Sequence, residues 1–154
     1  MFYRAIKTEA LQDFKEHLHG ELIGPGNDDY ESARRVWNGM IDKYPALIVR
    51  CSDVSDVVTA VQFARDHHLP LAVRGGGHSY AGNGTCDGGL VIDLSPMKRV
   101  QVDPVKRIAW AQAGLTLGEL IRETQAFGLA IPVGSASDTG LSGLTLGGLS
   151  GVGF

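Results

Sequence analysis

A glycine run flanked by polar side chains is the segment of the chain with the clearest chemical use. It reads Arg-Gly-Gly-Gly-His-Ser over residues 74–79 and directly follows a β-rich stretch. Consecutive glycines can turn several backbone N–H groups into one concavity, which binds phosphate oxygens. Arg74 could neutralise phosphate charge, and Ser79 could donate a hydroxyl hydrogen bond. The segment therefore predicts a phosphate-binding loop.

Two common nucleotide-binding motifs do not occur in the chain. Neither the dinucleotide fingerprint GxGxxG nor the P-loop pattern GxxxxGK is present. The loop at residues 74–79 therefore does not indicate NAD binding on a doubly wound sheet, nor P-loop nucleotide hydrolysis.

His78 lies at the tip of this loop. Beside a bound phosphate-bearing ligand, its imidazole could act as a nucleophile or transfer a proton. A solvent-exposed or capping histidine is the alternative. No Cys-x-x-Cys or Cys/His ligand pair occurs, so we expect no metal site. No residue stands out as a catalytic base, and the other histidines and the tyrosines are interpreted as structural: His17, His19, His67, His68, Tyr30, Tyr44 and Tyr80.

A second glycine cluster occupies residues 132–148. The chain holds 21 glycines, about twice the average usage. They concentrate in residues 75–89 and 128–153. In the second cluster glycines alternate with small and hydroxyl residues, which suits backbone packed flat against a planar ligand. Two flexible loops are the alternative. We expect both loops to converge at one edge of the domain, because each needs close approach to one extended ligand.

The first half of the chain predicts a strand–helix–strand unit. Residues 46–50 and 71–74 are β-rich, and between them a helix runs from Val54 to near His67. Its predicted buried face is formed by Val54, Val57, Val58, Val61, Phe63 and Ala64. A parallel, right-handed crossover should join the two strands. Earlier in the chain, residues 8–18 predict a short helix, and one helical turn is expected around Ala33.

The second half predicts shorter elements. Residues 90–94 form a buried-type strand, and residues 99–103 and 107–111 form two strands joined at Asp103-Pro104. Thr116 and Glu119 form a capping box that opens a helix through Ala126, with Gly128 as its stop. The fold class is therefore α+β, with mixed parallel and antiparallel sheets and flanking helices.

Composition limits the class of protein, the kinds of partner and the location that we expect for this chain. Its 154 residues are 44% hydrophobic and 20% charged, which fits one globular domain. No apolar run of about 18 residues occurs, and the first 15 residues lack a signal-peptide core, so neither a membrane partner nor secretion is expected. The net charge of −3 gives no electrostatic case for nucleic acid. Two cysteines, Cys51 and Cys86, suggest a reducing, cytoplasmic location.

The order of several motifs resembles a known family. Arg-Gly-Gly-Gly-His-Ser (74–79) is followed by Gly-Gly-Leu-Val-Ile-Asp-Leu-Ser (88–95), Ala-Gly-Leu-Thr-Leu-Gly-Glu-Leu (113–120) and Gly-Leu-Thr-Leu-Gly-Gly (143–148). This series is similar to the PCMH-type FAD-binding domain of the FAD-linked oxidases, and most similar to the berberine-bridge-enzyme-like branch. The resemblance covers roughly residues 30–148.

The resemblance implies FAD as cofactor and a site built from both glycine loops. Residues 74–79 would wrap the pyrophosphate, and His78 matches the family histidine that bonds covalently to the flavin 8-methyl carbon. No cysteine occurs at 135–137 for a second link. The cofactor-binding residues implied are Arg74, Gly75, Gly76, Gly77, His78, Ser79, Val133, Gly134, Thr139, Gly140, Gly143 and Gly147.

The implied activity is hydride transfer from a small alcohol, sugar or amine to the flavin, which carries that chemistry. The chain ends at Phe154 inside a glycine-rich loop, so we expect residues 1–154 to be a truncated N-terminal part of the domain, without the substrate domain. Exposed apolar surface would then favour self-association. Two alternatives are a non-catalytic flavin-binding remnant and a reductase of the same fold that holds FAD without a covalent bond. His78 favours covalent attachment over the reductase.

Overall fold

Two small sheets and their flanking helices make up the fold. The computed structural model describes residues 6–147. The elements in chain order are α1 (Thr8–Glu16), β1 (Glu21–Ile23), α2 (Tyr30–Ala33), β2 (Leu47–Arg50), α3 (Val54–Asp66), β3 (Leu71–Arg74), β4 (Leu90–Asp93), β5 (Val100–Asp103), β6 (Ile108–Ala111), α4 (Leu117–Gln125) and α5 (Leu141–Leu146). The α+β class with mixed sheets is confirmed.

The larger sheet has the order β1-β2-β4-β3. β2 and β3 both run parallel to β4, with Ile48 opposite Val91 and Val73 opposite Ile92. The predicted parallel relation of β2 and β3 is therefore confirmed, although β4 lies between them. All four residues of β4 are buried, as expected of a central strand covered on both faces.

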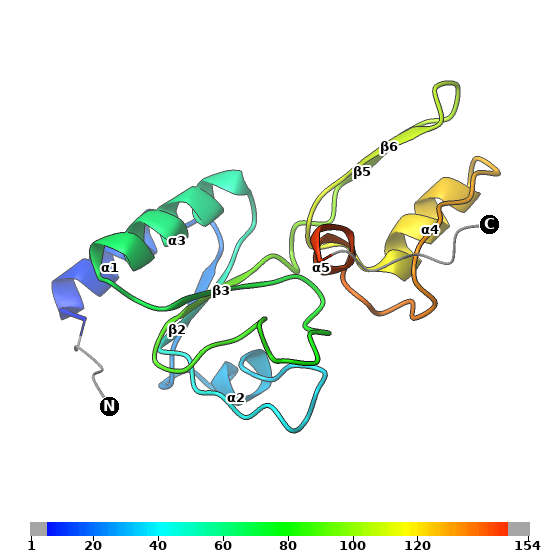
Figure 1. Ribbon diagram of the computed structural model, residues 1–154. Helices are drawn as coiled ribbons and strands as arrows, with labels where there is room; N and C mark the ends of the chain where they lie inside the picture. The colour runs from blue at the N-terminus through cyan, green and yellow to red at the C-terminus, as the bar shows by residue number, and fades with distance from the viewer. Residues whose placement is uncertain (1–5, 148–154) are drawn as a thin grey trace.

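Helices cover both faces of this sheet (Figure 1). α1 and α3 pack on one face, where the rings of Phe14 and Phe63 stack with centroids 3.9 Å apart. α2 packs on the other face, where Tyr30 lies over Ile48 and Val91 in a second apolar cluster. The carboxyl ends of β3 and β4 are left free of helices, and the first glycine loop leaves the sheet there.

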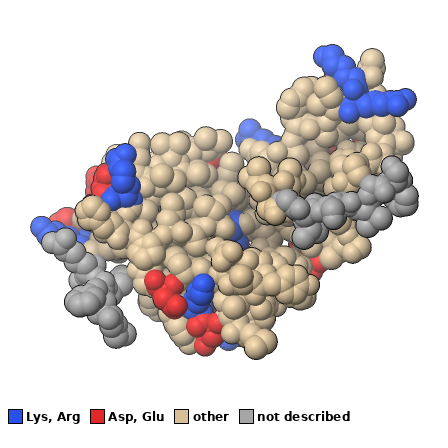
Figure 2. Space-filling model, viewed as in Figure 1, with Lys and Arg blue, Asp and Glu red and all other residues tan. Residues whose placement is uncertain are grey.

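The second sheet is the antiparallel hairpin β5–β6, which extends away from the larger sheet (Figure 1). α4 follows it and begins with the predicted capping box: Thr116 and Glu119 bond each other's backbone N–H groups. Gly128, at φ +67°, ends the helical region as expected. An open groove of about 870 Å³ lies between β6, α4 and α5 and has a largely apolar lining. In the view of Figure 2, lysine and arginine side chains lie at the tip of the hairpin, and others lie beside acidic side chains at the opposite end of the molecule.

Two elements were not predicted. β1 has three residues and pairs with β2. It forms because of this pairing, which its own short sequence does not predict. α5 occupies Leu141–Leu146 inside the second glycine cluster, where we expected a loop. Its glycine and threonine are weak helix formers, so tertiary contacts override local propensity.

The predicted buried face of α3 was wrong in part. Val54, Val58 and Val61 are exposed. The buried residues are Asp56, Ala60, Phe63 and Ala64. Asp56 is fully buried on the inner face of the helix, where it accepts hydrogen bonds from the backbone amides of His19 and Ser52. Within residues 6–147, no helix has the length and apolar character to cross a bilayer.

Candidate functional site

The two glycine loops touch through their backbones. A Cβ atom added to Gly76 would lie 2.3 Å from the amide nitrogen of Gly140, and one added to Gly140 would lie 2.1 Å from that of Gly76. A Cβ atom on Gly75 would lie 2.6 Å from Ser142 Oγ. Only glycine permits such approach. The expected convergence of the loops is therefore confirmed.

The first loop presents a row of free amides. Within residues 6–147, the N–H groups of residues 75–79 donate to no backbone carbonyl. The loop stays ordered through acceptors instead, since Gly77 accepts from the amide of Trp37 at 3.1 Å. Gly77 itself has φ +71°, a left-handed conformation that reverses the peptide direction there. Successive unpaired amides beside such a residue suit the oxygens of a phosphate or pyrophosphate.

His78 is held between two other segments. Its side chain is 18% exposed, and its Nε2 atom lies 3.4 Å from Asp138 Oδ2 in the second loop. On another side the Trp37 ring stacks on the imidazole, with centroids 5.3 Å apart and an interplanar angle of 21°. Tyr80 packs edge-on against Trp37. The imidazole therefore occupies a defined place at the junction of the loops.

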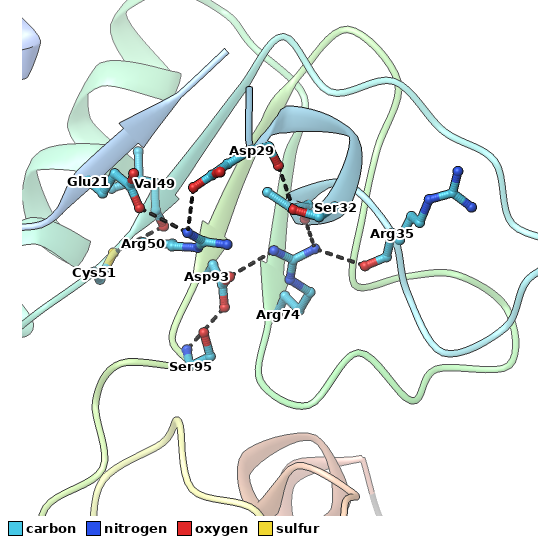
Figure 3. Close-up of polar contacts among 11 residues, drawn as sticks. Glu21, Asp29, Ser32, Arg35, Val49, Arg50, Cys51, Arg74, Asp93 and Ser95 are labelled. Atoms are coloured by element: carbon cyan, nitrogen blue, oxygen red, sulfur yellow. Dashed lines mark hydrogen bonds and ion pairs between the residues drawn. The ribbon is translucent and has the colours of Figure 1, made fainter. Parts of the chain in front are cut away.

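Arg74 faces inward. Its guanidinium is buried, pairs with Asp93 at 2.7 Å and donates to the carbonyls of Ala33 and Arg35 (Figure 3). Asp93 in turn accepts from the amide of Ser95. The expectation that the Arg74 charge would neutralise a phosphate is therefore corrected, because Asp93 already balances it. Any contact of Arg74 with a ligand stays a prediction for its backbone alone.

Of the remaining predicted residues, some lie at the contact between the two loops and the others lie away from it. Gly140 and the neighbouring Thr139 lie at the loop contact, where Thr139 accepts a hydrogen bond from the amide of Leu117. Gly134 packs against the side chains of Leu117 and Leu144, away from that contact. Gly143 faces open space on α5. Val133 is half-buried, Gly147 closes α5, and Ser79 Oγ accepts from the amide of Asn83.

Two residues of the junction were not predicted as site residues. Trp37 lies outside both glycine loops, and nothing in the local sequence places it over a loop about 40 residues away. Asp138 carried a usable signal: it is the only charged residue after Glu123. A lone charge inside a glycine-rich, otherwise uncharged segment favours a specific partner.

Both thiols are poor nucleophiles. Burial raises the pKa of Cys51 to about 12, and burial also raises the pKa of Cys86. Thiolate chemistry needs a lowered pKa. His19, Asp53 and Asp56 lie close enough together to be considered as metal ligands. Asp53, however, caps the N-terminus of α3, and Asp56 accepts hydrogen bonds from backbone amides. These contacts explain the cluster as the start of a helix.

Comparisons with known proteins agree with this geometry. A family model described as an FAD binding domain matches residues 45–154. The FAD-linked oxidoreductase YgaK of Bacillus subtilis is 40% identical over 134 residues, which are 87% of this chain and 30% of the relative. The crystal structure of 6-hydroxy-D-nicotine oxidase from Arthrobacter nicotinovorans superposes with a TM-score of 0.81 at 35% identity, covering 82% of this chain and 28% of that one.

A berberine-bridge-enzyme-like protein of Physcomitrella patens superposes with a TM-score of 0.82 at 29% identity, over 89% of this chain and 30% of that one. The resemblance to the berberine-bridge-enzyme-like branch and the PCMH-type fold are thereby confirmed. The chain spans about 30% of the length of the relatives it matches.

Proposed function

The chain belongs to the FAD-binding domain family, and from this premise we propose that its two glycine loops bind FAD for an oxidoreductase. The single observation that carries the proposal is the loop junction. There, a row of free amides at residues 75–79 lies beside the backbone contact of Gly76 with Gly140. The negative pyrophosphate would take hydrogen bonds from those amides, with no need of the Arg74 side chain.

The reaction class follows from the cofactor. A bound flavin supplies hydride acceptance, and the protein supplies position and electrostatics. We propose an alcohol, sugar or amine as substrate of the full-length protein. The similarity to 6-hydroxy-D-nicotine oxidase supports an amine, and the similarity to a xylooligosaccharide oxidase supports a sugar. The residues described here would bind and orient the cofactor; none of them is assigned as a catalytic base.

We further propose that His78 forms a covalent bond to the flavin through a ring nitrogen. His78 belongs to the loop that carries the amide row, so a dinucleotide seated on that loop would lie close to its imidazole. The contacts with Trp37 and Asp138 limit the motion of the ring.

Since Cys51 and Cys86 are both free thiols, we also propose a reducing, cytoplasmic location for the protein.

The test is the fate of the yellow colour in His78→Ala. Wild-type protein incubated with FAD should stay yellow after acid precipitation, and mass spectrometry should find a flavin adduct on the peptide containing His78. His78→Ala should bind FAD in the native state but release it on precipitation. His17→Ala, at an exposed site, is the matched control and should behave like the wild type.

Each other outcome selects an alternative. Wild-type protein that binds FAD and loses it on precipitation would indicate the non-covalent reductase. Wild-type protein that stays colourless after incubation would contradict FAD binding by this chain, and with it the proposed function.

A further inference from the structure

Two Asn-Gly dipeptides occur in the chain, Asn38-Gly39 and Asn83-Gly84. We propose that Asn83 is a site of spontaneous modification, at which the side-chain amide is converted to aspartate and isoaspartate, and that the fold protects Asn38 from the same reaction. The conversion needs only water and no cofactor. The inference therefore goes beyond the proposed function and does not depend on it.

The chemistry is the attack of a backbone nitrogen on the preceding side chain. The Gly84 amide loses its proton to the buffer, and its nitrogen forms a bond to Cγ of Asn83. The side-chain nitrogen takes up a proton and leaves as ammonia, which completes a succinimide ring. Water then opens the ring at either carbonyl and gives aspartate or isoaspartate, with no oxidation or reduction. Glycine favours ring closure because it has no Cβ atom to obstruct the attack.

Asn83 is free to react. Its side chain is exposed, and it forms no hydrogen bond with the described residues. The Gly84 amide donates to no backbone carbonyl among those residues. Both lie in the middle of a turn closed by a hydrogen bond of 3.4 Å from the Thr85 amide to the Gly82 carbonyl. Lys43 Nζ donates to the carbonyls of Gly82 and Thr85, so contacts hold the ends of the turn and none holds the Asn83 side chain.

Asn38 precedes a glycine too, but its side chain is held at both ends. Its Nδ2 donates to the carbonyl of Tyr80 at 2.9 Å, and its Oδ1 accepts from the amide of Met40 at 3.1 Å. Both hydrogen bonds must break before Cγ can meet the nitrogen of Gly39, which raises the barrier to ring closure. The two dipeptides therefore form a matched pair within one chain.

The reactive turn lies against the first glycine loop. The Asn83 amide donates to Ser79 Oγ at 3.2 Å, and a Cβ atom added to Gly84 would lie 3.9 Å from Gly77 Cα. In isoaspartate the main chain passes through the former side-chain carbon, which lengthens the backbone between these two contacts. The modification would thus place a negative charge and a longer backbone beside residues 74–79.

Ageing of the folded chain, followed by mass spectrometry, tests the proposal. The protein is incubated in mildly alkaline buffer, sampled over time and digested briefly with trypsin. The two dipeptides then fall in separate peptides, residues 36–43 and 75–98, each with a single asparagine. The fraction of each peptide that has exchanged an NH₂ group for an OH group gives its rate, and an isoaspartyl methyltransferase assay counts the isoaspartate. Circular dichroism melts check that each variant is folded.

We expect Asn83 to react about tenfold faster than Asn38 in the folded chain, because two hydrogen bonds restrain the Asn38 side chain. In urea, where neither side chain is restrained, the two rates should be similar. Gly84→Ala should suppress the reaction at Asn83, and its added methyl group fits, since the nearest atom would be Arg74 Cγ at 3.7 Å. Gly39→Ala, in open space, is the matched control and should leave the rate at Asn83 unchanged.

The proposal would be overturned by equal rates at the two sites in the folded chain, by a faster reaction at Asn38, or by no mass gain at Asn83. A difference that persisted unchanged in urea would also overturn it, because the local sequence and not the fold would then be the cause. Undiminished conversion in Gly84→Ala would exclude the attack by the Gly84 nitrogen.

Discussion

At the scale of single residues, the Arg74–Asp93 pair connects the sheet to the site. The two side chains are 8% and 6% exposed and lie at the ends of β3 and β4. Arg74 also binds the backbone of residues 33–35, the segment that leads into Trp37. The pair thereby holds the tryptophan segment against the loop that carries His78. Its role is architectural, and under the proposed function the backbone amides of the loop, and not the Arg74 side chain, would bind the ligand.

Arg74→Met should be strongly destabilising. The substitution leaves the Asp93 carboxylate buried without a counter-charge, which typically costs about 3–5 kcal/mol of unfolding free energy. Urea unfolding followed by circular dichroism measures the loss. Arg65→Met, which removes an exposed arginine paired with its neighbour Asp66, should change little. If the two variants were equally stable, the Arg74 pair would have no structural role.

At the scale of elements, the start of α4 holds the second glycine loop in place. Thr116 caps the helix and also forms an isolated bridge with Gly140. The amides of Leu117 and Gly118 donate to the carbonyls of Thr139 and Ser137. The second loop is therefore fixed by hydrogen bonds to the first turn of α4, which determines where Asp138 stands.

Thr116→Ala should lower stability by about 1 kcal/mol, the usual cost of losing a helix N-cap. Thr116→Ser keeps the capping oxygen and should lie close to the wild type. Thermal melts of the three proteins provide the measurement. Equal losses for Ala and Ser would mean that the threonine methyl group, and not its hydroxyl, matters.

The start of α3 should give stability a pH dependence. Hydrogen bonds from Ser55 and His19 hold the pKa of Asp53 well below its usual range, and the Asp53 carboxylate raises the pKa of His19. The Asp53 contribution is thus present above its unfolded pKa and lost as pH falls. The His19 contribution is present below its unfolded pKa and lost as pH rises through the raised value. Their ion pair is strongest between about pH 4.5 and 6.5.

His19→Gln should therefore destabilise the protein more at about pH 5.5 than at about pH 8.5. Urea midpoints at both pH values give the comparison. His67→Gln, which removes a histidine that forms no ion pair among the described residues, serves as control. A loss for His19→Gln that stayed constant across this range would contradict the ion-pair account.

The sequence predicted best what local rules determine. The capping box at Thr116, the hairpin turn at Asp103 and the buried strand at Leu90–Asp93 depend on neighbouring residues, and all were confirmed. The features that the sequence did not predict depend on contacts between residues far apart in the chain. β1 forms because it pairs with β2. The guanidinium of Arg74 is buried because it forms an ion pair with Asp93, which lies on the neighbouring strand. FAD contacts of the individual loop residues stay predictions.

At the scale of the whole molecule, the apolar groove predicts self-association. It is lined by Ile108, Leu129, Ile131 and Leu146, and Ile108 and Leu146 are exposed. Exposed apolar surface of this kind favours contact between copies. Light scattering of the 154-residue chain should show mass rising with concentration, and Ile108→Lys should reduce the effect. Val105→Lys, at the exposed hairpin tip outside the groove, is the control. A monodisperse monomer at every concentration would contradict the expectation.

The strand order of the larger sheet also constrains how the chain is made. β2 and β3 precede β4 in synthesis, yet each pairs with β4 and neither pairs with the other. A nascent chain that has emerged only as far as Gly89 can form α3, but it has no parallel ladder for that helix to cover. The sheet can be completed only after Leu90–Asp93 has been synthesised, because this strand lies between β2 and β3. Ribosome pausing just after this strand would give the central layer time to assemble before the glycine loops meet.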